Sequence, residues 1–248
     1  MYISKMEDWE FGVLQIHNPE FATYKPYFDL LNQLEHVPGD IIEFGVWRRA
    51  SLITSALILQ ELNSTKKLHG YDTFSGFPAN SLQDDFENFE RMYAAGQITK
   101  KHYDKVNLNK KHLRVSGKGT SVTEISGSLN FSATSYDLVV KKIEYFELSK
   151  YIELHVQDVN FITQLDLPPA ISLALLDLDL YQGYEKVLPL IWDKLQPGGT
   201  IYLDEYYSLK FPGPRIAVDE FAAQIGSKPE KLCMWMDFER WAFRKPVL

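Results

Sequence analysis

Cysteine is almost absent from this chain of 248 residues, because Cys233 is the only one. A disulfide within the chain and a cysteine-rich zinc site are therefore both excluded. The chain also lacks any run of about 18 apolar residues, the length that a membrane-spanning helix needs. The N-terminal stretch MYISKMEDWEFGVLQIHNPE carries acids and no apolar core of signal-peptide length. These absences predict a cytoplasmic enzyme or binding protein without a membrane partner.

Basic residues are also fewer than acidic residues. The 26 lysines and arginines are outnumbered by 33 acids, which gives a formal net charge of −7. A general nucleic-acid binder usually presents a basic face, so we expect no nucleic-acid partner. Hydrophobic residues make up 45% of the chain, and this is enough for a sizeable core in one large domain or two small ones.

Short apolar runs alternate with stretches of helical periodicity along most of the sequence. This alternation predicts a parallel sheet that is covered by helices on both faces. We interpret residues 1–248 as a single α/β domain, with an N-terminal helical segment at 1–38 and an inserted lid at about 80–150. The expected strands are 41–46, 67–74, 151–158, 170–179 and 200–206, and the expected helices are 27–34, 49–62, 135–147, 184–199 and 213–226, followed by a terminal hairpin.

Four further residues of the insert and of the helix at 184–199 receive their own interpretations. Asp84 is assigned to a solvated helix face of the insert, and Pro189 predicts a kink or an early end of its helix. His102 and His112 also fall in the insert, where one of them is a secondary candidate for a catalytic base.

Acidic residues stand at or near the end of every predicted strand. In open parallel sheets, ligands bind beyond the carboxyl ends of the strands. A single acid there is often only a turn former or a helix N-cap, but five strand ends in order favour a binding site. The residues are Glu43 with Gly45, Asp72, Asp158, Asp177 with Asp179, and Asp204 with Glu205.

The first half of the sheet has the features of a nucleoside site. Gly45, just after the first strand, allows a ligand to approach the backbone. Asp72 ends the second strand, where a carboxylate can accept both hydroxyls of a ribose. The dinucleotide fingerprint G-x-G-x-x-G is missing, because Arg48 and Arg49 occupy the segment where further glycines are expected. The site therefore need not hold a pyrophosphate.

The second half of the sheet supplies a candidate metal site. Asp177 and Asp204 end strands that we expect to be adjacent, and Glu205 lies beside them. Such carboxylates repel one another strongly, and Mg²⁺, Mn²⁺ or Ca²⁺ would relieve the repulsion. Asp179 is the weaker candidate ligand, and we assign it to capping the helix that starts near Tyr181.

Four motifs resemble the macrocin O-methyltransferase family. They are GDIIEFGVWRRAS, YDTFSGFP, LLDLDLYQGYEKVLPLIWDKLQPGGTIYLDEY and FPGPRIAVDEF. The resemblance runs from about Gly39 to Phe221, and residues of about 80 to 150 do not visibly match. It implies the class I methyltransferase fold, a Rossmann-like sheet of seven strands with the last antiparallel.

The resemblance also implies roles for the residues at the strand ends. Glu43, Gly45 and Ser51 would surround the methionine end of S-adenosylmethionine. Asp72 would hold its ribose, and Asp158 would lie near the adenine.

Three further residues match the family's metal ligands. Asp177, Asp204 and Glu205 would hold Mg²⁺ or Mn²⁺, although Glu205 stands where the family usually has Asp. Asp177 is also the candidate for accepting the proton of the substrate hydroxyl. A second departure is Arg49-Ala50, where the family tends to have two glycines.

The sequence thus predicts an S-adenosylmethionine-dependent, metal-dependent O-methyltransferase. Its substrate would be a small-molecule hydroxyl, on a sugar of a glycosylated natural product, and we expect a homodimer or higher homo-oligomer. Two alternatives stay open at this point. One is a non-catalytic nucleoside-binding protein on the same fold, and the other is an NAD-linked oxidoreductase.

Overall fold

The fold is built on one seven-stranded sheet, seen in a computed structural model that describes residues 23–47, 50–77, 80–125, 132 and 134–247. The strand order is β3-β2-β1-β4-β5-β7-β6. The first five strands in this order, β3, β2, β1, β4 and β5, pair in parallel. Strand β7 runs antiparallel to both β5 and β6. The predicted sheet of seven strands with an antiparallel last strand is confirmed. The strands are β1 (Asp40–Phe44), β2 (Leu68–Asp72), β3 (Ile152–Val156), β4 (Ile171–Leu176), β5 (Leu195–Leu203), β6 (Glu230–Trp235) and β7 (Phe238–Arg244).

The central strands have the residue pattern that a sheet covered on both faces requires. Every residue of β4, Ile171–Leu176, is buried. Continuous apolar runs of this kind are typical of parallel strands between two helical layers. The sequence pattern and the topology therefore agree for the centre of the sheet.

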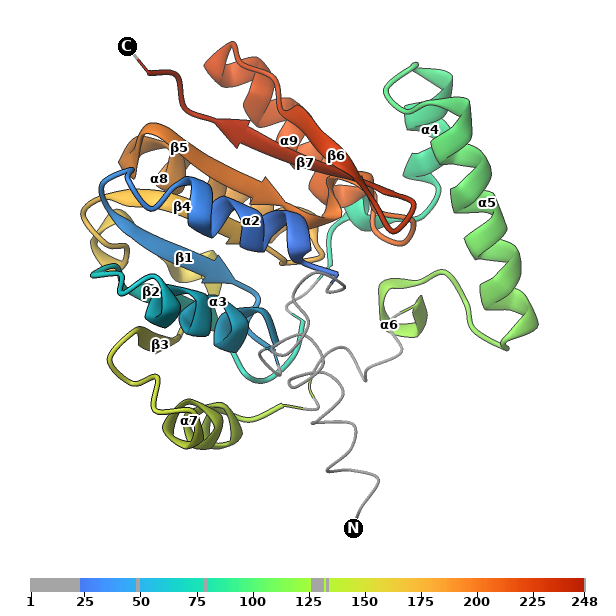
Figure 1. Cartoon of the computed structure of the whole chain (residues 1–248). Coiled ribbons are helices and arrows are strands. Elements are labelled where there is room, and N and C mark those ends of the chain that lie inside the picture. Colours follow the sequence, from blue (N-terminus) through green and yellow to red (C-terminus); the bar gives the residue numbers. More distant parts are fainter. Residues whose placement is uncertain (1–22, 48–49, 78–79, 126–131, 133, 248) are drawn as a thin grey trace.

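Helices cover the sheet from both sides (Figure 1). On one face α2, α3 and α7 share a core with residues such as Ile41 and Leu175, and on the other face α8 and α9 share a core with Ile42 and Leu176. The helices are α2 (Lys25–Gln33), α3 (Ala50–Glu61), α4 (Asn88–Ala94), α5 (Lys100–Val115), α6 (Val122–Ile125), α7 (Tyr136–Tyr145), α8 (Tyr181–Lys194) and α9 (Gly213–Ile225), with short 3₁₀ turns η2 (Leu82–Asp84), η4 (Val159–Phe161), η5 (Gln164–Asp166) and η6 (Asp204–Tyr207).

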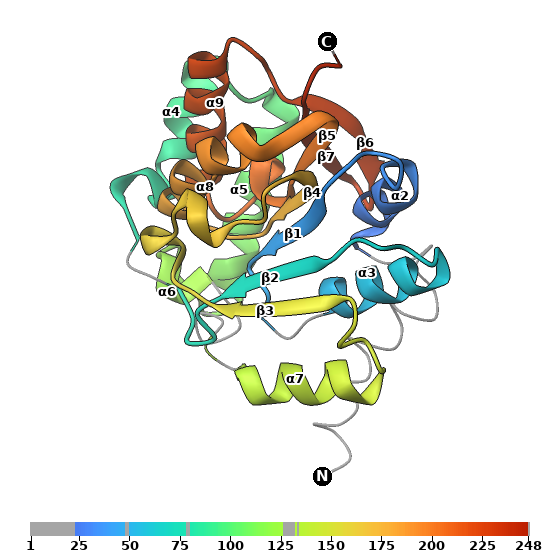
Figure 2. The ribbon, with the colours of Figure 1, turned by 90° about the vertical axis from the view of Figure 1, so that its left-hand side faces the viewer.

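The segment expected as an insert has two structurally different parts. Helices α4 and α5 form a separate small core, which includes Phe89, Val106 and Leu113, and they stand beyond the ends of the strands (Figure 1). Helix α7 instead lies beside the β3 edge (Figure 2) and buries Val139 and Ile143 in the core of the sheet.

Helix α8 differs from its expected bounds. It runs through Pro189 and ends at Lys194, so the early boundary at the proline is not observed. Strand β5 then begins directly at Leu195 and includes both glycines that were expected to close the helix. The terminal hairpin is confirmed as β6 and β7. None of the helices that the structure describes is both long and apolar enough to cross a bilayer.

Candidate active site

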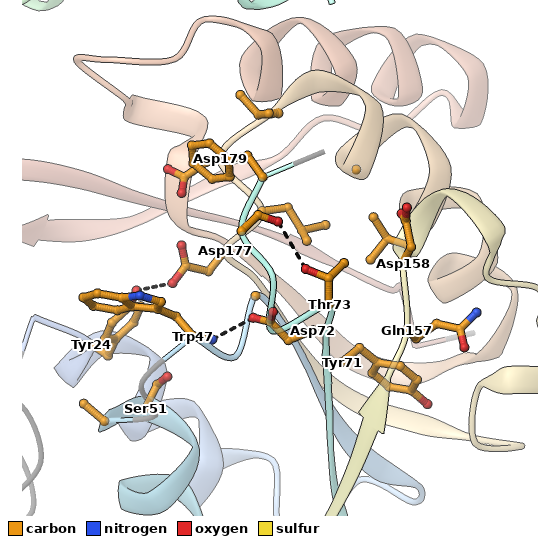
Figure 3. Close-up of a pocket in the computed structure, with 18 of the residues that line it drawn as sticks. Tyr24, Trp47, Ser51, Tyr71, Asp72, Thr73, Gln157, Asp158, Asp177 and Asp179 are labelled. Carbon is orange, nitrogen blue, oxygen red and sulfur yellow. Dashed lines mark hydrogen bonds between the residues drawn. The ribbon is translucent and has the colours of Figure 1, made fainter. Parts of the chain in front are cut away.

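A cavity of ≈ 270 Å³ opens at the carboxyl ends of the parallel strands. Tyr24 and Trp47 lie on one side of it, Gln157 and Asp158 lie on the other, and Asp72 lies between them (Figure 3). The predicted residues that line it are Gly45, Ser51, Asp72, Asp158, Asp177 and Asp179.

Glu43 and Ser51 form one buried pair next to this cavity. Glu43 is completely buried, and its Oε1 accepts a 2.6 Å hydrogen bond from the Ser51 hydroxyl. Only Ser51 lines the cavity. Glu43 therefore acts on the site by holding the first turn of α3 against the end of β1.

Gly45 allows two strands to come together at the base of the cavity. Its φ is +89°, and an added Cβ would lie 1.7 Å from the backbone oxygen of Asp177. No L-residue with a side chain fits at that distance, so a glycine is required here. Gly45 thus brings the end of β1 next to the backbone of Asp177.

The carboxylate of Asp72, at the end of β2, accepts hydrogen bonds from the backbone of two loops. Its Oδ2 accepts the backbone N–H of Trp47 at 2.7 Å, and its Oδ1 accepts the backbone N–H of Phe74 at 2.6 Å. Both of those residues have positive φ, at 37° and 52°, a conformation that side-chain-bearing residues adopt uncommonly. A carboxylate offers about four lone-pair sites, so Asp72 keeps acceptor capacity for a ligand in the cavity.

Asp158 marks the opposite end of the cavity. Its Oδ1 accepts the backbone N–H of Asn160 at 2.9 Å and so caps η4. Tyr71 lines the same region and stacks on Phe44, with ring centroids 4.8 Å apart. This end combines an aromatic side chain with an acidic one.

The three predicted metal ligands come together at the ends of β4 and β5. Asp177, Asp204 and Glu205 each present a carboxylate oxygen, and these oxygens lie within 4.8 Å of one another. Asp177 also lines the cavity. The acidic cluster and the cavity are therefore joined through this one side chain.

Each carboxylate of the cluster has a partner that the sequence patterns did not identify. The Tyr24 hydroxyl donates to Oδ2 of Asp177 at 2.6 Å (Figure 3). The buried guanidinium of Arg240, on β7, donates to Oδ1 of Asp204 at 3.1 Å. The Tyr184 hydroxyl, on α8, contacts Glu205. Tyr24 and Arg240 come from outside the motif that carries the three acids, so that motif could not have revealed them, whereas Tyr184 lies within it, 21 positions before Glu205.

The electrostatics of this cluster favour a bound cation. Burial and the nearby charge of Asp177 raise the pKa of Asp204 to about 6. Burial, followed by repulsion from Asp177 and Asp204, also raises the pKa of Glu205 well above its usual range. Three carboxylates and one arginine carry a net charge of −2 (−3 + 1) when ionised, and a divalent cation would balance this charge.

Two of our assignments for acidic residues are wrong. Asp179 does not cap α8, because it lines the cavity with a φ of 60° and Leu180 occupies the N-cap position. The cap comes from Asp84, whose Oδ1 accepts the backbone N–H of Tyr181 at 2.8 Å. Asp84 is only 2% exposed and therefore does not belong to a solvated helix face.

His102 has a structural role. It is buried and stacks on Tyr207 with ring centroids 4.0 Å apart, and its Nε2 makes a 2.8 Å hydrogen bond to the Ser208 carbonyl. The histidine ties α5 to η6 and does not line the cavity. His112 is exposed, and Arg48 and Arg49 lie outside the described residues.

The sheet order, the reversed last strand and the cavity at the strand ends define a class I methyltransferase fold. The chain is similar to the macrocin O-methyltransferase family, whose sequence model matches residues 29–116. The resemblance inferred from the motifs is thereby confirmed. The match covers β1 and β2 with Glu43, Gly45, Ser51 and Asp72, and it ends before the strands that carry the acidic cluster.

Individual relatives extend the similarity over most of the chain. Demethyldecarbamoylnovobiocin O-methyltransferase of Streptomyces niveus is 25% identical over 209 residues, which are 83% of this chain and 66% of that protein. The chain therefore spans slightly less than two thirds of that relative's length.

Two solved structures share the fold. The O-methyltransferase NovP aligns with a TM-score of 0.62 at 19% identity over 90% of this chain and 80% of NovP. The calicheamicin methyltransferase CalS11 aligns with a TM-score of 0.61 at 22% identity over 88% of this chain and 77% of CalS11.

Proposed function

We propose that this chain is an S-adenosylmethionine-dependent and divalent-metal-dependent O-methyltransferase. Its acceptor would be a hydroxyl of a small molecule, on a sugar of a glycosylated natural product. The observation that carries the proposal is the contact between the acidic cluster and the cavity through Asp177. The names of two similar proteins refer to novobiocin and to calicheamicin, and these names support the proposed substrate class.

The cavity suits the cofactor in its chemical character. Asp72 would accept the ribose hydroxyls, while its existing bonds to two backbone N–H groups keep the carboxylate in place. Ser51, held by Glu43, would lie at the methionine end, and Asp158 would lie near the adenine. When bound, S-adenosylmethionine supplies an electrophilic methyl group for transfer to a nucleophilic oxygen.

The acidic cluster suits a hard divalent cation, because its ligand atoms are carboxylate oxygens. Asp177, Asp204 and Glu205 would hold Mg²⁺ or Mn²⁺. When bound, such an ion supplies Lewis-acid and orienting chemistry at a substrate oxygen. Glu205 would reach the ion from a buried position, in which Tyr184 holds its carboxylate.

The chain's own residues would then align the acceptor and accept its proton. Tyr24 donates to Oδ2 of Asp177, and the carboxylate held in this way would contact the ion or accept the proton of the hydroxyl. Alignment of donor and acceptor is worth about 7–11 kcal/mol in well-oriented reactions. We infer that positioning by the strand ends supplies most of the rate enhancement.

The test is a methyl-transfer assay with isotopically labelled S-adenosylmethionine and a panel of sugar and catechol acceptors. We expect transfer that requires Mg²⁺ or Mn²⁺, is abolished by chelation, and is lost in Asp177→Asn. Asp29→Asn is the matched control, because this carboxylate pairs with Lys25 on the surface of α2. Full activity after thorough chelation would remove the metal from the proposal.

Calorimetry separates the alternative classes. S-adenosylhomocysteine should bind tightly and NAD should not. Tight NAD binding without a response to S-adenosylhomocysteine would instead support an oxidoreductase. A homodimer or higher homo-oligomer and a cytoplasmic location remain predictions, and light scattering tests the first of them.

A further inference from the structure

A second group of potential metal ligands lies on β2 and β3, away from the acidic cluster. His69, Glu153 and His155 present one ligand atom each, and these atoms lie within 4.8 Å of one another. In the parallel register His69 pairs with Glu153, and Tyr71 pairs with His155. Their side chains therefore project from the same face of the sheet. Strand β3, which carries Glu153 and His155, lies at the edge of the sheet (Figure 2).

Two of the three distances within this group are close to those of tetrahedral coordination. Nδ1 of His69 lies 3.2 Å from Nε2 of His155 and 3.7 Å from Oε2 of Glu153. A tetrahedral zinc ion with bonds of about 2.0–2.1 Å has ligand atoms about 3.3 Å apart. The two rings are nearly parallel, with an interplanar angle of 19°, so both would rotate to direct their lone pairs at one ion.

The carboxylate of Asp40 lies close to the second ring nitrogen of His69. Nε2 of His69 is buried without a hydrogen-bond partner among the described residues, and its nearest carboxylate oxygen is Oδ2 of Asp40 at 3.5 Å. Oδ1 of Asp40 is itself held by the backbone N–H of Lys67 at 2.9 Å. Metal-binding histidines generally direct their second ring nitrogen at such a carboxylate. The tautomer with hydrogen on Nε2 leaves Nδ1 free to bind an ion.

The other two side chains are also available. His155 is partly buried, and its Nε2 faces Nδ1 of His69 at 3.2 Å. Glu153 is half exposed, which leaves a path from solvent. Lys67 approaches only its other oxygen, Oε1, at 3.9 Å.

We propose that His69, Glu153 and His155 bind a late first-row transition-metal ion, such as Zn²⁺ or Co²⁺. Two imidazole nitrogens and one carboxylate favour such an ion over Mg²⁺, whereas the acidic cluster has only oxygen ligands. The open fourth position would hold water. His155 stacks on Tyr71 with ring centroids 4.4 Å apart, and Tyr71 lines the cavity, so an ion here would also fix one wall of that cavity.

The experiment titrates untagged protein with Co²⁺ in excess Mg²⁺, so that the acidic cluster is already filled. We expect one Co²⁺ per chain, visible absorption bands of tetrahedral intensity, and displacement of the Co²⁺ by Zn²⁺. His155→Ala and Glu153→Gln should each weaken binding by more than about tenfold, and Asp40→Asn by about 10- to 100-fold. His112→Ala is the control, because this exposed histidine lies outside the group.

Melting curves without metal would verify that each variant folds. No variant of His69 is used, because this residue is buried and its replacement can disturb folding. Glu153 is exposed, so Glu153→Gln tests the site without that risk. The proposal is overturned if Co²⁺ binding is unchanged in both His155→Ala and Glu153→Gln. It is equally overturned if the bands vanish in Asp177→Asn, or if wild-type protein binds no Co²⁺ in excess Mg²⁺. None of these readouts depends on methyl transfer.

Discussion

The hydroxyl of Tyr24 donates a 2.6 Å hydrogen bond to Oδ2 of Asp177, although 153 positions separate the two residues. Tyr24 immediately precedes α2, and Asp177 immediately follows β4. The contact therefore joins the N-terminal helix to the residue that connects the cavity with the acidic cluster. Burial and the charge of Asp177 raise the pKa of Tyr24 well above its usual range, so the phenol remains a donor at neutral pH.

Tyr24→Phe should lower catalytic efficiency without unfolding the chain. A hydrogen bond to a charged group is worth about 1.5–3 kcal/mol, so we expect kcat/KM to fall by about 10- to 100-fold. Tyr27→Phe is the control on the same helix, because Tyr27 packs on Tyr202 in the core and does not contact the cluster. Equal kinetics in the Tyr24 variant and wild type would show that the hydrogen bond does not position Asp177.

Asp84→Ala should destabilise the start of α8. The buried carboxylate accepts the backbone N–H groups of Tyr181 and Ser81, each at 2.8 Å. Loss of a cap costs about 0.5–2 kcal/mol, and orphaned buried donors add about 1–3 kcal/mol. We expect the free energy of unfolding in urea to fall by about 2–4 kcal/mol. Asp85→Ala changes an exposed neighbour and should stay within about 0.5 kcal/mol of wild type; similar values for both variants would contradict the capping role.

His102 should make the anchoring of α5 sensitive to acid. Burial lowers the pKa of His102, so the folded state binds fewer protons than the unfolded state just below the usual histidine pKa of about 6.5. Its contribution to stability is complete above that pH and decreases as the pH falls towards the folded-state pKa.

Urea unfolding at about pH 5 and about pH 7.5 measures this effect. His102→Gln should be less stable than wild type at neutral pH and should lose less stability on acidification. His112→Gln should keep the wild-type pH dependence, because that histidine is exposed. An unchanged pH dependence in His102→Gln would exclude this histidine as the source.

Metal removal should destabilise the chain more at alkaline than at acidic pH. The pKa of Asp204 is raised to about 6 by burial and Asp177, so the folded state retains a proton that the unfolded state loses at about 3.9. Without metal, stability should fall as the pH rises from about 4 to about 6, by on the order of 3 kcal/mol.

Thermal melts with Mg²⁺ or a chelator test this expectation. The increase in Tm caused by Mg²⁺ should be larger at about pH 8 than at about pH 5. Asp177→Asn removes the like charge and should reduce the difference, whereas Asp29→Asn should not. An Mg²⁺ effect that is independent of pH would contradict this interpretation.

The sequence patterns predicted the parts of the fold that depend on local composition. The apolar strands, the acids at their ends and the helix Gly213–Ile225 all follow from periodicity and turn chemistry. The meeting of Asp177 with Asp204 also followed, because neighbouring parallel strands place their carboxyl ends at one edge.

Contacts between distant elements could not be predicted in this way. Arg240 reaches Asp204 from the last strand, and Asp84 caps a helix that starts 97 positions later. In the sequence Asp84 resembles its solvated neighbours, and only tertiary packing distinguishes it from them. Pro189 was misleading for a similar reason, because burial of Leu188 and Ile191 maintains the helix on both sides of it.

The most direct test is the anomalous scattering of a crystal grown with Mn²⁺ and S-adenosylhomocysteine. The account predicts one strong peak in coordination contact with Asp177, Asp204 and Glu205, beside the sulfur of the bound product. The absence of a peak at these three carboxylates, or carboxylates that point away from one another in the presence of Mn²⁺, would contradict it.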